Sequence, residues 1–341
     1  QSHRKDEHVF LAEKFHQDDR QNDFDGLRFI HQSLPELAIA DVDISTQFAG
    51  TTWQSPFYIN GMTGGSQQTK KLNAQLAQVA QIAGLPMAAG SQSVAIKDPT
   101  LVDTFSVIRE FNPAGFILAN IGAGNDLSVA QKAVAMTQAN ALEIHVNTAQ
   151  EVVMPEGDRE FYWLDQIGEI VANLDVPVIV KEVGFGMSAE TIAKLQSVGV
   201  TNIDVSGKGG TNFVTIENER RRDKAYDYLS DWGQSTVESL FESQAFQNEL
   251  TILASGGIRN PLDIVKALRL GASAVGISGQ ILHMLLKTGP TETAEQLLAW
   301  QAQIQSIMAM LGARNLTALQ SAPMILSPNL RHYLNERHLS L

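Results

Sequence analysis

The sequence of 341 residues contains no cysteine. This absence excludes disulfides, thiolate nucleophiles, CxxC redox pairs and zinc or iron–sulfur sites with cysteine ligands. Demanding chemistry must therefore come from histidine, carboxylates, lysine, hydroxyls or a bound cofactor. A chain of this length buries roughly 75% of the surface that its extended form exposes, so it can form a large core without disulfides.

Basic residues are also scarce. The chain has 25 Lys and Arg against 37 Asp and Glu, which gives a formal net charge of -12. A protein that binds nucleic acid usually presents a basic face, so we expect no nucleic-acid partner. A small anionic ligand remains possible, because a few local cations and backbone N–H groups can hold one phosphate against the net charge.

Long hydrophobic runs are missing as well. The most apolar stretch, Ser273 to Leu286, is interrupted by Gly276, Gly279, Gln280 and His283, and it is shorter than the ~18 apolar residues of a membrane span. The N-terminal sequence QSHRKDEHVF is polar and lacks the apolar run of a signal peptide. We therefore expect a cytoplasmic protein with no membrane partner.

From about Pro56 onward, short apolar runs alternate with segments of helical periodicity, which is the pattern of repeated βα units on a parallel sheet. Eight such runs predict eight strands and hence an α/β fold, a closed (β/α)8 TIM barrel. The runs are Phe57 to Gly61, Pro86 to Gly90, Gly115 to Asn120, Leu142 to Val146, Pro177 to Val183, Thr201 to Gly207, Thr251 to Gly256 and Ser273 to Gly279. The alternative, an open doubly wound sheet, normally has GxGxxG after its first strand, where this chain has GMTGG.

Helices are expected between these strands. Apolar residues at helical spacing predict helices over Leu72 to Ala83, Leu262 to Leu270 and Glu295 to Leu311, the last capped by Gly312. We find no boundary within the barrel and predict a single domain over residues 1–341, with a 1–50 N-terminal extension. A polar insertion, 207–232, follows the sixth strand and is long enough to be a lid or an oligomer contact.

Two glycine-rich segments end the seventh and eighth strands. In a barrel, reactive groups gather at the carboxyl ends of the strands, and the usual phosphate site lies at the last two. Here these ends read SGGIR, from Ser255 to Arg259, and SGQ, from Ser278 to Gln280. Their glycines either make tight turns or let backbone N–H groups approach a phosphate. Hydroxyls of Ser206 and Thr211 on the neighbouring strand end favour a phosphorylated cofactor.

Lys181 ends the apolar run PVIVK, so its ammonium must lie in or on top of the barrel, where an isolated charge is unfavourable. Three interpretations compete. Lys181 could be the Schiff-base lysine of an aldolase, it could pair with Glu182, or it could face the electron-rich edge of a flavin. Polar groups of GMTGG and Asn120 around a ring-sized space favour the flavin.

Polar residues also follow the fourth strand. His145 within LEIHV could be an interior or a catalytic histidine. Asn147, Gln150 and Glu151 come directly after it and could meet a substrate headgroup and a hard cation such as Mg²⁺. One carboxylate suits a Mg²⁺ that keeps several waters and takes its other ligands from a diphosphate.

Two basic clusters stand out in this acidic chain. Arg4 and Lys5, with His8, lie in an N-terminal segment that would ordinarily be solvated. The run of three arginines, 220–222, is flanked by Glu217, Glu219 and Asp223, and this mixture is typical of a solvated loop.

Taken in order, these motifs resemble the type 2 isopentenyl diphosphate isomerases, flavin-dependent (β/α)8-barrel enzymes of isoprenoid biosynthesis. The resemblance covers nearly the whole chain. The matching segments are RKDEH (4–8), NGMTGG (60–65), GSQS (90–93), ANIGA (119–123), HVNTAQE (145–151), MPEGDR (154–159), VKEVGFG (180–186), SGKGGTNF (206–213) and SGGIRNPLD (255–263). The RKxxH segment and the QE pair are specific, since other FMN barrels do not share them.

The resemblance implies an FMN site, a substrate site and a metal ligand. FMN would be held by Met62, Thr63, Gly64, Ser91, Asn120, Lys181, Ser206 and Thr211, and its phosphate by Gly256, Gly257, Ile258, Arg259, Ser278 and Gly279. The substrate would meet Arg4, Lys5, His8, Ser91, Gln92, Ser93, His145, Asn147 and Gln150, with Mg²⁺ on Glu151. Ser93 departs from the family, because many members have Arg after GSQ.

The implied reaction interconverts isopentenyl and dimethylallyl diphosphate by an allylic proton shift. An unactivated alkene is a poor base, so the acid must be strong, close and sheltered from water. Reduced FMN would act as acid and base, with Lys181 stabilising the reduced ring and Gln150 and His145 orienting substrate or relaying protons. The resemblance also implies NADPH or another reductant for the flavin and a homo-oligomer, tetramer or octamer.

Two other function classes remain open from the residues. An FMN-dependent 2-hydroxy-acid oxidase would share the barrel, the lysine and the phosphate loops, but it would usually need a His/Arg pair to hold a carboxylate. Arg259, at the phosphate site, is the one arginine that we find at a predicted strand end. A non-catalytic flavin-binding protein would not require Gln150, Glu151 and RKxxH together.

Overall fold

The computed structural model describes residues 2–17 and 20–341, and side chains from residue 5 onward within these ranges. Its centre is a closed barrel of eight parallel strands in the order β10-β11-β4-β5-β6-β7-β8-β9. The strands are β4 (Phe57–Ile59), β5 (Met87–Ala88), β6 (Ile117–Gly122), β7 (Ala141–His145), β8 (Val178–Lys181), β9 (Asn202–Asp204), β10 (Thr251–Ser255) and β11 (Ala274–Ile277). Each lies within or overlaps one of the eight predicted runs, so the TIM barrel is confirmed and the open sheet was the wrong alternative.

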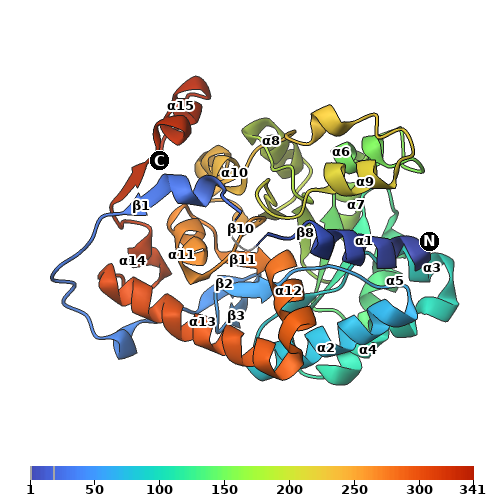
Figure 1. The fold of residues 1–341 in the computed structure, drawn as a ribbon, viewed down its shortest axis with the longest axis horizontal. Coiled ribbons are helices and arrows are strands. Elements are labelled where there is room, and N and C mark those ends of the chain that lie inside the picture. Colours follow the sequence, from blue (N-terminus) through green and yellow to red (C-terminus); the bar gives the residue numbers. More distant parts are fainter. Residues whose placement is uncertain (1, 18–19) are drawn as a thin grey trace.

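Helices surround the barrel (Figure 1). Those that follow the strands are α2 (Gln67–Ala83), α4 (Asp103–Phe111), α5 (Leu127–Thr137), α7 (Leu164–Asn173), α8 (Ala189–Ser197), α10 (Thr236–Glu242), α11 (Pro261–Arg269), α12 (Gly279–Thr288) and α13 (Pro290–Met310). Short helices α3 (Ser93–Lys97), α6 (Thr148–Val153) and α9 (Phe213–Arg220) occupy the loops at the carboxyl ends of strands. The three helices predicted from periodicity are all present, and Gly312 has the left-handed φ of 69° expected after α13.

The N-terminal extension wraps around the barrel in three parts. Helix α1 (Ser2–Lys14) contacts α2, α9 and α12 and lies in front of the barrel strands in Figure 1. Strand β1 (Leu27–Phe29) pairs antiparallel with β12 (Met324–Leu326), which stands between α14 (Leu316–Leu319) and α15 (Pro328–Glu336). Strands β2 (Thr46–Phe48) and β3 (Thr51–Trp53) form a small antiparallel hairpin.

That hairpin supplies part of the core inside the barrel. Phe48 and Trp53 are almost fully buried, with ring centroids 4.8 Å apart, and the Trp53 ring packs edge-on against Tyr58 of β4. The same cluster contains small and aliphatic residues from six other strands: Ala88, Leu118, Ala141, Ile179, Leu253 and Ala274. An apolar layer therefore fills the barrel beside the β2–β3 hairpin.

Two residues further along four of these strands, the inward positions become polar. Side chains of a strand alternate between faces, so residues two apart share the barrel interior. Leu118 is followed in this way by Asn120, Ala141 by Glu143, Ile179 by Lys181, and Leu253 by Ser255. The polar layer lies toward the carboxyl ends of the strands, where barrel enzymes have their active sites.

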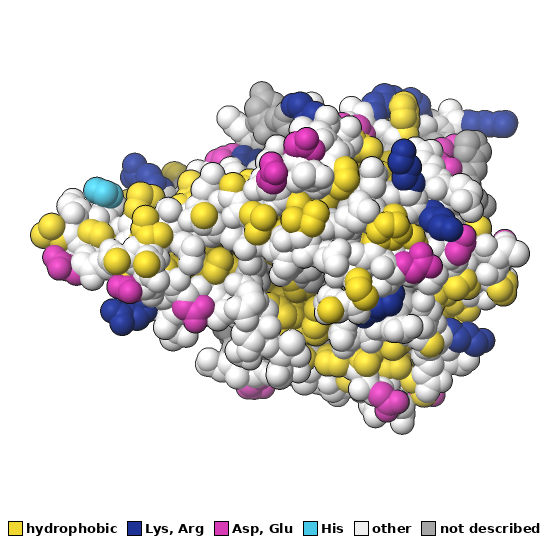
Figure 2. All heavy atoms as spheres, turned by 90° about the horizontal axis from the view of Figure 1, so that it is seen from below, with side chains coloured by type: hydrophobic (Ala, Val, Ile, Leu, Met, Phe, Trp, Pro, Cys, Tyr) yellow, Lys and Arg dark blue, Asp and Glu magenta, His cyan; other side chains and the backbone are white. Residues whose placement is uncertain are grey.

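The outer surface also carries apolar side chains. Ile82 at the end of α2, and Leu298 and Met310 on α13, are about half exposed. Figure 2 shows the molecule from below, the side on which Figure 1 shows α2 and α13, with apolar side chains spread among a few charged ones. Within the described residues, no helix is long and apolar enough to cross a membrane.

Candidate active site

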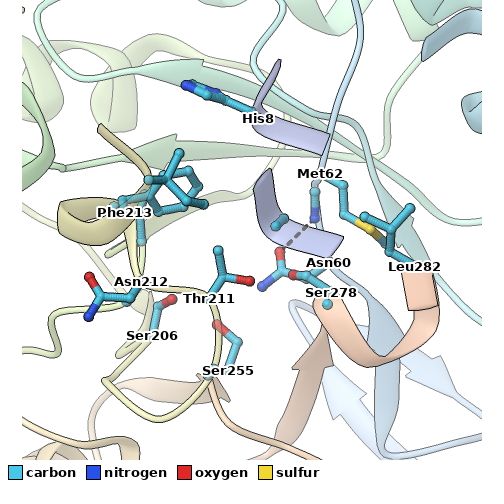
Figure 3. Close-up of a pocket in the computed structure, with 18 of the residues that line it drawn as sticks. His8, Asn60, Met62, Ser206, Thr211, Asn212, Phe213, Ser255, Ser278 and Leu282 are labelled. Carbon is cyan, nitrogen blue, oxygen red and sulfur yellow. Dashed lines mark hydrogen bonds between the residues drawn. The ribbon is translucent and has the colours of Figure 1, made fainter. Parts of the chain in front are cut away.

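A cavity of about 430 Å³ opens at the carboxyl ends of the barrel strands. Its walls come from loops after β4, β5, β7, β9 and β10, from the start of α12, and from helices α1 and α9. In Figure 3, the side chains of Ser206, Thr211, Ser255 and Ser278 gather in one part of the pocket, away from His8. Met62 and Leu282 lie on one side of it, with Phe213 on the other.

The hydroxyl-bearing end of the cavity has a backbone cradle. Gly256 and Gly257 take left-handed φ angles of 102° and 76°, which glycine adopts without strain. A Cβ on Gly257 would lie 2.9 Å from the Gly209 carbonyl carbon, so the two loops approach too closely for a side chain. Gly279 begins helix α12 on the same wall, where its N-terminal N–H groups favour an anion. This end fits a phosphate.

Arg259 reaches this region, but its guanidinium is already engaged. It donates to Asp263 through Nε (2.8 Å) and to Asp25 through Nη1 and Nη2 (3.0 and 2.7 Å). These carboxylates hold the pKa of Arg259 above its usual range. The side chain therefore fastens the N-terminal extension to α11, which leaves backbone groups as the main phosphate donors.

Lys181 is buried at the mouth of the barrel and lines the cavity. Its Nζ donates to the Glu182 backbone carbonyl at 2.8 Å. The Glu182 carboxylate turns away and accepts from the backbone N–H groups of the next three residues. Burial raises the pKa of Glu182 to about 7, although those N–H groups and the Lys181 charge oppose the shift. The pairing of the two side chains, one of the three interpretations, is thus absent among these contacts.

Asp204 of β9, which no sequence motif indicates, is the centre of a buried network. Its carboxylate accepts from the Tyr58 hydroxyl at 3.0 Å, from Asn60 Nδ2 at 3.3 Å and from the Ser255 hydroxyl at 2.9 Å. It also accepts from the backbone N–H of Ser206, which has an unusual φ of 32°. Burial and the Asp204 charge raise the pKa of Tyr58 well above its usual value. The network fixes polar side chains under the cavity.

Three residues of β6 and β7, two of them buried, form a second chain of hydrogen bonds. Asn120 Nδ2 donates to Glu143 Oε2 at 2.8 Å, and Asn120 Oδ1 lies 2.9 Å from His145 Nδ1. Burial raises the pKa of Glu143 to about 7, opposed by the charge of Lys181. Burial lowers the pKa of His145 to about 3, and the charges of Lys181 and Lys5 add to this effect, while a hydrogen bond with the Ile121 backbone opposes it. His145 is therefore neutral at pH 7.

Glu217 of α9, which the motifs did not reveal, holds Gln150. Gln150 Nε2 donates to Glu217 Oε1 at 2.9 Å, and His8 Nε2 lies 3.0 Å from the same oxygen. Arg220 binds the other oxygen and also reaches Glu7 and Glu156. The prediction of a solvated loop was wrong for Arg220, because the turn of α9 brings its side chain into this network, where it is 14% exposed.

Burial alone would raise the pKa of Glu217, but the contacts with His8, Gln150 and Arg220 outweigh it and bring this pKa down to about 2. Glu217 is therefore ionised at pH 7, although its side chain is completely buried. A signal was available in the sequence, since a carboxylate three residues before an arginine on a helix can pair with it.

Glu151, the predicted magnesium ligand, lines the cavity beside Asn147. Its Oε1 accepts from Asn147 Nδ2 at 2.9 Å and its Oε2 from the Asp158 backbone N–H at 2.7 Å. In the described part of the chain, no cluster of three or more His, Asp or Glu could hold a metal ion. A cation here would need most of its ligands from a bound substrate or from water, as expected for Mg²⁺ on a diphosphate.

Helix α1 covers the cavity and brings Lys5 and His8 to it. It is fastened by Glu7 to Arg220, by Lys14 to Glu219 at 3.2 Å, and by Glu13 to His283 of α12 at 2.8 Å. The side chain of Arg4 lies outside the described side chains. The insertion 207–232 forms another wall through Thr211 and α9.

Most residues expected at the site line this cavity, and four do not. Lining residues are Lys5, His8, Met62, Ser91, Asn120, His145, Asn147, Gln150, Glu151, Lys181, Ser206, Thr211, Gly256, Gly257, Ile258, Arg259, Ser278 and Gly279. Thr63, Gly64, Gln92 and Ser93 are absent from the lining. Gln92 is fully buried, with its amide bonded to the Asn120 N–H and the Ala133 carbonyl, so it supports Asn120 from behind.

Comparison with known proteins places this chain in a class. Residues 110–326, more than half of the chain, match the family model of FMN-dependent dehydrogenases. Among solved structures, a flavocytochrome b2 mutant has a TM-score of 0.67 at 18% identity, covering 96% of this chain and 84% of that one. A mandelate oxidase complex has a TM-score of 0.63 at 17% identity, covering 94% of this chain and 90% of that one. These structures share the fold, and the chain is a member of the FMN-dependent barrel proteins.

Curated relatives narrow the class. An isopentenyl-diphosphate delta-isomerase of Latilactobacillus sakei is 99% identical over all 341 residues and 98% of its own length. Proteins of the same name are 55% identical in Lacticaseibacillus paracasei, over 99% of this chain and 98% of the relative, and 49% identical in Listeria monocytogenes, over 99% and 95%. The chain belongs to the FMN-dependent isopentenyl-diphosphate delta-isomerases, as the motif resemblance predicted.

Proposed function

We propose that this protein interconverts isopentenyl and dimethylallyl diphosphate with reduced FMN and Mg²⁺. The observation that carries the proposal is that one cavity contains two separate regions suited to binding an anion. One is the glycine cradle beside α12, and the other has Lys5 and His8 of α1 next to Gln150 and Glu151. A phosphorylated cofactor and a separate diphosphate substrate need two such regions, with the reacting groups between them.

The residues fit FMN. The cradle of Gly256 and Gly257 excludes any Cβ and suits its phosphate, and Ser206 and Thr211 supply hydroxyls there. Lys181 would lie against the ring, where its buried ammonium needs an anionic partner. The same site would use Met62, Thr63, Gly64, Ser91, Asn120, Ile258, Arg259, Ser278 and Gly279. When bound in its reduced form, FMN supplies the proton donor and acceptor for the allylic shift.

The substrate would lie between this ring position and α1. Lys5, with Arg4, would bind the diphosphate by charge, and Glu151 would hold Mg²⁺ on it. His8, Ser91, Gln92, Ser93 and Asn147 complete the proposed substrate contacts. Two of these, Gln92 and Ser93, do not line the cavity, so they would act only through neighbouring residues.

The remaining residues prepare the reaction by orientation and by exclusion of water. Gln150 is 9% exposed and is held by an ionised Glu217, so its amide keeps one orientation toward the cavity. His145 is neutral, so it offers a ring-nitrogen lone pair and adds no second positive charge near Lys181. Helices α1 and α9 cover the cavity, which shelters a developing carbocation from water.

Further parts of the proposal come from the family resemblance. NADPH or another reductant would reduce the flavin, and the chain would act in the cytoplasm as a homo-oligomer, a tetramer or octamer. The half-exposed apolar side chains of α2 and α13 make the face in Figure 2 a place to look for subunit contacts. We also propose that residues 1–341 form one domain, with the extension and the insertion as parts of the site.

The test is anaerobic NMR of the FMN-bound protein with Mg²⁺ and isopentenyl diphosphate, once with the flavin oxidised and once after reduction by dithionite. Dimethylallyl diphosphate formed only in the reduced sample supports the proposal. No product in either sample, with FMN demonstrably bound, contradicts it. Bleaching of the flavin by a 2-hydroxy acid in that case would indicate an oxidoreductase instead.

A further inference from the structure

We propose that Glu143 is a positioning residue that acts through Asn120 to place the imidazole N–H of His145 on Nδ1. The inference rests on the proposed function only where it assigns His145 a part in the isomerisation. The hydrogen-bonded arrangement itself is independent of the substrate.

The backbone places the three side chains in one row. Strands β6 and β7 pair in parallel with Asn120 opposite Glu143 and Gly122 opposite His145. Glu143 and His145 are two residues apart on β7, so both face the interior of the barrel, with Glu143 one layer deeper. The Asn120 side chain lies between them and contacts both, at 2.8 Å and 2.9 Å.

The chemistry of each group then fixes which atoms donate and which accept along this row of hydrogen bonds. The Asn120 amide has one end that donates, Nδ2, and one that accepts, Oδ1. In its ionised form Glu143 offers acceptor oxygens only, so it holds the Nδ2 end and turns Oδ1 toward the imidazole. An amide oxygen cannot donate, and the contact with His145 is a hydrogen bond only if Nδ1 carries the proton. In the neutral ring, Nε2 then keeps the lone pair.

This direction matters because an isolated neutral imidazole prefers its proton on Nε2. Without Glu143, the Asn120 amide could rotate by half a turn, present Nδ2 to the ring and stabilise the opposite tautomer equally well. The pattern matches other sites in which a second residue selects the tautomer of a working histidine.

A packing role does not explain Glu143. It is completely buried in a barrel whose neighbouring interior layer is apolar, where a leucine would fill the space at less cost. Its Oε1 has no hydrogen-bond partner among the described residues, and its Oε2 accepts from Asn120 Nδ2. Glu143 also lies in the field of the Lys181 charge, but its hydrogen bond is the one that orients Asn120.

The test measures the tautomer directly. The FMN-bound protein is labelled with ¹⁵N-histidine, and the ring nitrogens of His145 are assigned by their loss in His145→Gln. Long-range ¹⁵N–¹H NMR then distinguishes Nδ1–H from Nε2–H in the wild type, Glu143→Gln and Glu143→Leu. Glu182→Gln is the matched control, because it removes another buried carboxylate of similar pKa that contacts loop N–H groups instead of Asn120.

We expect Nδ1–H in the wild type and in Glu182→Gln. Glu143→Gln should populate Nε2–H as well, because a glutamine amide can satisfy either orientation of Asn120. Glu143→Leu should populate Nε2–H more strongly. If Glu143→Leu fails to fold, the nearly isosteric Glu143→Gln still decides whether Glu143 sets the tautomer. In the isomerase assay, kcat of Glu143→Gln should fall about 10- to 100-fold with KM changed much less.

The outcomes separate this inference from the proposed function. If both Glu143 variants keep Nδ1–H, or the wild type has Nε2–H, the positioning role is refuted even in an active isomerase. It is also refuted if kcat falls while the tautomer stays unchanged. If the tautomer responds as expected but the wild type forms no dimethylallyl diphosphate, the positioning role stands and the proposed function fails.

Discussion

Glu217→Gln tests whether the buried network over the cavity depends on one ionised carboxylate. In the folded chain the pKa of Glu217 is about 2, against an ordinary value of 4.5. At about 1.4 kcal/mol per pKa unit, that difference corresponds to about 3 kcal/mol of stability at pH 7. Removing the charge also leaves Arg220 and His8 without their buried partner. In comparable sites, such a loss lowers the free energy of unfolding by about the same amount.

The pH dependence has a defined sign. A carboxylate whose pKa is lowered by folding stabilises the folded state above its unfolded pKa, and this contribution is lost as the pH falls toward the folded pKa. With values of 4.5 and about 2, the contribution of Glu217 shrinks from about 3 kcal/mol at pH 7 to about 2 kcal/mol at pH 3.5. Glu217→Gln should lack this dependence, so the wild type and the variant converge as the solution is acidified.

The assay is urea unfolding of both FMN-bound proteins at pH 7 and at decreasing pH, followed by circular dichroism. Glu219→Gln is the matched control on the same helix, because Glu219 pairs with Lys14 and Lys224 at the surface, where removal of one charge changes stability little. Equal destabilisation by the two variants would refute the reasoning, as would a difference between wild type and Glu217→Gln that stays constant with pH.

Three further predictions address other parts of the site and the barrel. Lys181→Met should lower kcat/KM at least about 100-fold in the isomerase assay with little change in thermal unfolding; full activity with FMN bound would exclude the proposed role of Lys181. Trp53→Ala should lower the free energy of unfolding by about 3–5 kcal/mol in urea, because it empties the apolar layer beside the hairpin, and a loss below about 1 kcal/mol would contradict that core. Gly257→Ala should weaken FMN binding by about 10- to 100-fold in a fluorescence titration, since its Cβ forces the cradle open. Gly84→Ala has a similar φ and open space around it, so it should leave FMN binding unchanged, and equal weakening would argue against the cradle.

The strands and most of the cavity could be predicted because they depend on local patterns. Buried parallel strands are continuous apolar runs, and residues at their carboxyl ends must meet at one end of a barrel. Lys181, Gly257 and Gln150 were found in this way, and each lines the cavity. Gln92 was assigned to the substrate from its motif, but the direction of its amide depends on Ala133 and Asn120, which are far away in the sequence.

Residues that act through partners were also missed, because their partners are far away in the sequence. Glu143 and Asp204 stand inside apolar strands, and their importance lies in contacts with other strands, such as Tyr58 to Asp204 across the barrel. Arg220 has the neighbours of a surface residue in the sequence. It is enclosed because α9 packs beside α1 and α6.

The sequence by itself determined the architecture, the family and the set of residues that could bind a phosphorylated flavin, because apolar periodicity and short motifs are properties of neighbouring residues. Only the tertiary structure decided which polar groups are connected. It joined Gln150 to Glu217, tied Arg259 to Asp25, and aligned Glu143, Asn120 and His145 in one row. Hydrogen bonds reach about 3 Å and depend on direction, so they are set by how strands and helices pack rather than by spacing along the chain.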